Sequence, residues 1–204
     1  MKKILVTGLL SIGLFFQLSA QTKFSFQGGV NLMKLKTTIS GLSLAFNSEA
    51  SLNAGLIADF QGSGTFNVRS GLLYNSYASS LSILSMGGDK NTQYVNYLSI
   101  PLLGRLKISD KLYGFAGPQF SYLMSAKAKF DNGDSEDTKN ELESINFSGL
   151  FGAEYQFSDK FRLGVSYTAG LSKVNKETEM TEGLDAGSAK SSFNGFNFNI
   201  GFSF

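Results

Sequence analysis

Residues able to carry out catalysis are sparse in this sequence. It contains no histidine and no cysteine, so the usual general base near neutral pH is missing, and neither a thiolate nucleophile nor a metal site built on His and Cys can form. A Ser–Lys dyad is the one alternative that the composition leaves open, although serines and lysines are scattered through segments that read as loops. We therefore predict a protein that is not an enzyme, with no catalytic residue, cofactor or metal.

An acidic segment, residues 131–137 (DNGDSED), offers oxygen ligands and a glycine that could suit calcium. It lacks the spacing of an EF-hand, because Leu142 occupies the position where that loop has its twelfth-position glutamate. We predict a solvated external loop here rather than a metal site.

Five charged residues occur instead on the polar side of segments that alternate large apolar with small polar residues: Asp59, Arg69, Arg105, Glu154 and Arg162. If these segments close around a common interior, the five must pair or hydrogen-bond, because an isolated buried charge is unfavourable. One interpretation is a proton path, an ion path or a ligand site. The other, which we favour, is a structural ion-pair network, because small barrels fill their interiors with side chains.

Period-two alternation dominates the chain after residue 21 and indicates β-strands. It is clearest at the end, where Phe196, Phe198, Ile200, Phe202 and Phe204 alternate with Asn, Gly and Ser. The same pattern, with varying regularity, predicts about eight strands, at residues 24–33, 51–61, 65–79, 92–107, 111–124, 145–157, 161–171 and 193–204. No run of 18 apolar residues follows the N-terminus, so a transmembrane helix is excluded.

The predicted connections alternate strictly between short and long. Tight turns built from Gly, Asp and Ser occupy residues 61–65, 109–111 and 158–160, whereas residues 34–50, 80–91, 125–143 and 172–192 form long segments. Outer-membrane barrels show this asymmetry, with short periplasmic turns and long external loops. The sequence thus predicts an all-β fold: a transmembrane antiparallel up-and-down β-barrel of about eight strands.

The orientation of the two strand faces distinguishes this barrel from a soluble β-sandwich or lipocalin-like barrel, which also alternates. Eight strands enclose an interior suited to Gly, Ser, Asn and paired charges, so the phenylalanine face must point outward, where lipid but not water would accept it. Tyrosines near strand ends would form an interfacial belt in the absence of Trp: Tyr74, Tyr77, Tyr94, Tyr97, Tyr113, Tyr122 and Tyr155.

The first twenty residues read as an export signal. Lys2 and Lys3 form a basic start, residues 4–18 are largely apolar, and Ala20 offers a small residue at a cleavage point. An uncleaved anchor is the alternative, although no stop-transfer pattern follows. We predict a signal peptide at residues 1–20 and one domain at residues 21–204. Loss of Lys2 and Lys3 balances the 18 basic and 16 acidic residues, and without a basic stripe we expect no nucleic-acid partner.

A family resemblance rests on three motifs. Residues 97–105 (YLSIPLLGR), 113–119 (YGFAGPQ) and 152–155 (GAEY) resemble the PorT-like outer-membrane β-barrel family of Bacteroidetes. The resemblance spans most of the chain after residue 20 and implies an eight-stranded barrel in the bacterial outer membrane. It implies no single activity, because that family includes a type IX secretion component as well as barrels without an assigned role.

Two groups of apolar residues are candidate contact sites, one in the predicted loops and one at the end of the last strand. An apolar loop patch comprises Leu42, Leu44, Phe46, Leu81, Ile83 and Met86; strands that continue beyond the bilayer would explain it, and a contact surface for a protein, lipid or apolar ligand is the functional alternative. Ile200, Phe202 and Phe204 resemble the C-terminal signal read by barrel-insertion machinery. Expected partners are outer-membrane lipid, that machinery and another envelope or secretion protein. The leading hypothesis is a structural or protein-interaction role through external loops; the others are a secretion or transport accessory and a narrow pore.

Overall fold

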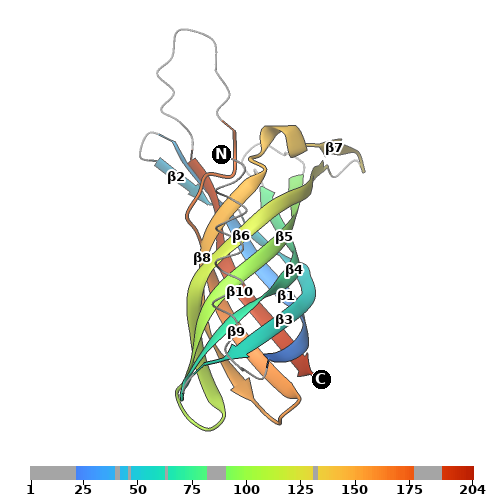
Figure 1. Ribbon diagram of the computed structural model, residues 1–204. Helices are drawn as coiled ribbons and strands as arrows, with labels where there is room; N and C mark the ends of the chain where they lie inside the picture. Colours follow the sequence, from blue (N-terminus) through green and yellow to red (C-terminus); the bar gives the residue numbers. More distant parts are fainter. Residues whose placement is uncertain are drawn as a thin grey trace, which may run out of the picture.

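Eight long antiparallel strands close into a barrel (Figure 1). The computed structural model describes residues 22–39, 42–45, 47–62, 64–81, 91–130, 133–176 and 190–204, so the predicted signal peptide lies outside the described residues. The barrel strands are β1 (Thr22–Ile39), β3 (Asn47–Gln61), β4 (Phe66–Leu81), β5 (Asn91–Lys107), β6 (Leu112–Lys129), β8 (Ile145–Gln156), β9 (Phe161–Gly170) and β10 (Lys190–Ser203). Because β10 pairs with β1 from Ser25–Ser203 to Thr38–Lys190, the eight long strands form a closed ring. The predicted fold class is confirmed.

The connections separate to the two ends of the barrel. The short β3–β4, β5–β6 and β8–β9 turns lie at the end that also holds the C-terminus, and we call this the short-turn end (Figure 1). At the opposite, long-loop end, β2 (Leu42–Ala45) pairs with β1, and β7 (Ser135–Asp137) pairs with β6 ahead of the 3₁₀ helix η1 (Lys139–Glu141). Among the described residues, no helix is long and apolar enough to span a membrane.

Two of the predicted loops begin too early. β1 continues to Ile39 and β6 to Lys129, although we placed residues 34–50 and 125–143 in loops. The prediction failed because the outward positions become polar there, at Lys34, Lys36 and Lys127, so the apolar alternation stops. The backbone ladder continues beyond this point, because its hydrogen bonds do not depend on which side chain faces outward.

The outer face carries the large apolar side chains, as the alternation predicts. Phe196, Phe198 and Ile200 are each at least half exposed, whereas the intervening Asn197 is buried. On β6 the apolar outward positions run from Leu112 to Met124. This is about 40 Å of strand and, at a tilt of about 40°, about 30 Å along the barrel axis. That height matches the hydrocarbon core of a bilayer.

Three of the predicted belt tyrosines point inward. Tyr77 and Tyr97 are 3% and 0% exposed, and Tyr113 stacks on Arg105, with the guanidinium carbon 3.5 Å from the ring centroid. Their strand parity explains this, because Tyr77 lies two residues after the buried Asn75 and Tyr97 two before the buried Ser99. The remaining four, on the outer face, are Tyr74, Tyr94, Tyr122 and Tyr155.

Pro101 occupies an interruption in the β4–β5 ladder. The register passes from Ser70–Leu102 to Leu73–Ser99 without partners for the two residues between on each strand. The Ser70 hydroxyl donates a hydrogen bond to the Pro101 carbonyl at 2.9 Å and bridges the interruption. A locally unpaired position is where proline, which has no N–H, fits within a sheet.

Candidate functional site

An ion-paired layer lies inside the barrel, near the short-turn end. It contains the five charged residues singled out above. Arg69 from β4 lies at its centre and binds two carboxylates at once. It donates to Asp59 through Nε at 2.6 Å and Nη2 at 3.0 Å, and to Glu154 through Nη1 at 2.6 Å and Nη2 at 3.0 Å. Such bidentate pairing is the strongest form of side-chain hydrogen bonding.

Glu154 on β8 is shared by all three arginines. Besides Arg69, it accepts a hydrogen bond from Arg105 Nε at 2.6 Å, and Arg162 Nε lies 3.6 Å from its second carboxylate oxygen. Arg162 also donates to the hydroxyls of Ser25 at 2.7 Å and Ser203 at 3.4 Å. Three guanidinium groups therefore face two carboxylates, and the layer carries a formal excess of one positive charge.

The strand register explains how residues far apart in sequence meet here. Asp59 and Arg69 are direct partners across β3 and β4. Arg162 pairs with Gly201 of β10, where a Cβ atom would lie 2.5 Å from the arginine Nε. The absence of a side chain at residue 201 thus makes room for the Arg162 guanidinium inside the barrel.

A neutral polar layer follows above the ion pairs. Asn53 donates to Asn31 at 2.7 Å, Asn197 donates to Thr168 at 2.9 Å, and the hydroxyls of Ser99 and Ser121 are 2.9 Å apart. These short side chains come from six of the eight barrel strands, and their small size suits so narrow an interior.

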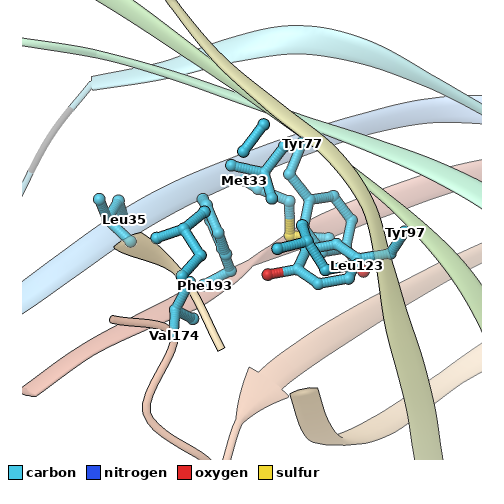
Figure 2. Close-up of a cluster of buried hydrophobic side chains, with 10 residues drawn as sticks. Met33, Leu35, Tyr77, Tyr97, Leu123, Val174 and Phe193 are labelled. Atoms are coloured by element: carbon cyan, nitrogen blue, oxygen red, sulfur yellow. The ribbon is translucent and has the colours of Figure 1, made fainter. Parts of the chain in front are cut away.

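An apolar plug closes the interior toward the long-loop end (Figure 2). Tyr77 packs its ring 5.5 Å from that of Tyr97 and 5.4 Å from that of Phe193. The plug comprises Met33, Leu35, Tyr77, Val95, Tyr97, Leu123, Ala126, Leu142, Val174 and Phe193. Sequence reasoning missed it, although the continued inward parity of Met33 and Leu35 was a usable signal.

Two of the plug residues come from connections rather than from barrel strands. Leu142 follows η1, and Val174 follows β9. The backbone N–H of Glu143 donates to the Val174 carbonyl at 2.8 Å, and that of Lys176 donates to the Glu141 carbonyl at 2.9 Å. The two connections therefore bind each other across the mouth of the barrel and hold its apolar closure in place.

The barrel has a large open volume at its short-turn end and a much smaller one deeper inside. A vestibule of about 360 Å³ at the short-turn end reaches inward to Asp59, Arg105 and Arg162. At the ion-paired layer itself, Arg69 and Glu154 border a much smaller hollow of about 30 Å³. The arrangement is a charged vestibule that narrows to a packed polar and apolar interior.

The remaining predicted residues are the C-terminal apolar residues, the apolar loop patch and the acidic segment. Ile200, Phe202 and Phe204 lie on the outer face of β10 and its end. Leu42 and Leu44 belong to β2, and Leu81 ends β4, but their side chains are not described; Phe46, Ile83 and Met86 lie outside the described residues. The described part of the acidic segment, like the rest of the described chain, holds no group of three or more acidic, His or Cys side chains placed to bind a metal.

An eight-stranded closed barrel with a lipid-facing apolar band and a charged interior defines the class of transmembrane β-barrels of the bacterial outer membrane. The chain belongs to the outer membrane protein beta-barrel domain family, whose model matches residues 15–176. It is accordingly a protein of the bacterial outer membrane, as predicted.

Several solved structures are similar to this chain. Neisserial surface protein A is 14% identical, with a TM-score of 0.54, and the match covers 89% of this chain and 97% of that one. Ail, the attachment invasion locus protein of Yersinia pestis, is 14% identical over 89% of this chain and 98% of its own, with a TM-score of 0.47. OprG from Pseudomonas aeruginosa is 11% identical over 91% and 97%, with a TM-score of 0.44. No curated protein sequence matches this chain.

Proposed function

We propose that this outer-membrane barrel is not an enzyme and that it acts through the segments at its long-loop end, either structurally or by binding another envelope protein. The observation that carries the proposal is the double closure of the interior. Arg69 and Glu154 bind each other across the barrel, and the plug around Tyr77 fills the lumen above them. This closure supports a structural role for the middle of the barrel and leaves the segments at the long-loop end as the surface for contact with partners.

The closure also argues against a narrow pore. A solute would have to displace Arg69 from two carboxylates and then pass the plug, both of which are costly in a low-dielectric interior. We expect the refolded protein to give no conductance steps above background in planar bilayers. Reproducible single-channel steps would revive the pore and remove the main support for a role carried by the loops.

The interaction role is tested on the loop patch. Replacing Leu42, Leu44, Leu81 and Ile83 together with serine should abolish recovery of a crosslinked envelope partner, because an apolar contact surface would be lost. A matched variant, Ser43→Thr with Ser82→Thr, changes the same segments and keeps the leucines. Equal recovery from the wild type and the serine variant, with both barrels assembled, would leave only a structural role.

The second candidate, an accessory of secretion or transport, is favoured by the PorT-like resemblance. Its motif side chains Tyr97 and Arg105 face the interior, as does Glu154, so they support the barrel itself, and a secretory contact would again lie on the loops. Deletion of the gene should then reduce the set of proteins released by the cell. An unchanged set of released proteins would eliminate this candidate.

A further inference from the structure

The vestibule at the short-turn end carries more positive charge than its surroundings neutralise. Five cationic and three carboxylate side chains line it. Two of the carboxylates are already bound, Asp59 by Arg69 and Asp110 by Lys107, at 2.6 Å and 3.1 Å. Within the described part of the chain, Lys23, Lys111 and Lys160 make no ion pair at all. The third carboxylate, Asp159, makes no ion pair among the described residues, so the lining holds two more cations than carboxylates.

Arg162 is the buried member of this group. Its residue is 6% exposed, yet its nearest carboxylate oxygen is Oε2 of Glu154, 3.6 Å away. Arg69 already binds this oxygen, and Arg69 and Arg105 both bind Oε1. Arginine cannot lose its proton in a protein, so burial does not remove the charge. A buried guanidinium that lacks a close counter-charge is unfavourable unless an anion accompanies it.

Two serine hydroxyls lie against the Arg162 guanidinium. Ser25 and Ser203 accept hydrogen bonds from its two terminal nitrogens, and among the described residues neither hydroxyl donates onward. The hydroxyl proton of Ser203 and the remaining guanidinium protons of Arg162 are therefore available at the vestibule, which both residues line. Guanidinium with hydroxyl donors is the arrangement that recognises phosphate and carboxylate oxygens.

We propose that the vestibule is a binding site for an oxyanion group, a phosphate or carboxylate, which Arg162 and Ser203 hold from the inside and Lys23 and Lys160 hold at the rim. A volume of about 360 Å³ accommodates such a group with several waters. In the outer membrane the short-turn end faces the periplasm. The anion would therefore be a soluble periplasmic one or the headgroup of a phospholipid from the inner leaflet.

The first test uses the protein without residues 1–20, folded in an uncharged detergent and titrated with inorganic phosphate at constant ionic strength. We expect saturable binding, followed by the broadening of the ³¹P resonance, and a loss of about tenfold or more in affinity for Arg162→Gln. Lys176→Gln is the control, because it removes one positive charge at the opposite end of the barrel. No saturable binding by the wild type, or equal weakening by both variants, would overturn the proposal.

A second variant protects the test against misfolding of Arg162→Gln. Lys23→Gln with Lys160→Gln removes two exposed rim cations that make no ion pair in the described structure, and it should weaken phosphate several-fold in a barrel that remains heat-modifiable. Unchanged affinity in this variant would also overturn the proposal. Phosphate binding is then measured in nanodiscs with and without phosphatidylglycerol. Weaker phosphate binding in the nanodiscs that contain phosphatidylglycerol assigns the site to a lipid headgroup, and equal binding in both assigns it to a soluble anion.

Discussion

Glu154→Gln should destabilise the barrel strongly, because one carboxylate serves three arginines. The substitution keeps the shape of the side chain but removes the charge that Arg69 and Arg105 contact at 2.6 Å. The layer would change from three cations against two anions to three against one, in an interior where Glu154 is 3% exposed. Breaking a buried pair by removing one partner costs about 3–5 kcal/mol, and the sharing places this case toward the upper end.

The assay is urea unfolding of the barrel refolded into lipid vesicles, followed by the difference in gel mobility between unboiled and boiled samples. Glu143→Gln is the matched control, because it makes the same change at an exposed position and should cost less than about 0.5 kcal/mol. The double variant Glu154→Gln with Arg105→Gln restores the charge excess to one and should recover about 1–3 kcal/mol. A loss below about 1 kcal/mol for Glu154→Gln, or no recovery in the double variant, would refute the reasoning.

Three further predictions concern packing and assembly. Gly152→Ala should cost about 1–3 kcal/mol in the same assay, because its Cβ would overlap the carbonyl oxygen of Val165, whereas Gly149→Ala should be near neutral, having only ordinary contact; equal effects would contradict the close approach. Tyr97→Phe should be neutral or slightly stabilising, because its hydroxyl is buried without a partner in the described structure; a loss above about 1 kcal/mol would instead reveal a bound water. Phe204→Ser should lower the fraction of heat-modifiable barrel in cells and leave refolding in vitro intact, because this exposed side chain belongs to the proposed insertion signal. A pulse-chase gel that shows equal assembly of the variant and the wild type would contradict that role.

The strand number, the closed topology and the orientation of the faces were predictable from the sequence. A period of two is a local property, so Phe196, Phe198 and Ile200 against Asn197 and Asn199 already separate a lipid face from an interior. The short and long connections are also visible in the sequence. With eight strands, their alternation places both ends of the barrel domain at the short-turn end. The identity of the five interior charges was also readable, because parity within each strand assigns them to the polar face.

The pairing of those charges and the apolar plug inside the barrel were decided only by tertiary structure. Arg69 reaches Glu154 across a distance of 85 residues in the chain, and Leu142 and Val174 enter the plug from connections that show no periodicity. Which arginine lies farthest from the shared carboxylate of Glu154, Arg162 at 3.6 Å, depends on the stagger of eight strands and on the space left at Gly201. A local pattern determines the face on which a side chain lies, but the partner that it meets there is set by the register between strands, which is a property of the closed sheet as a whole.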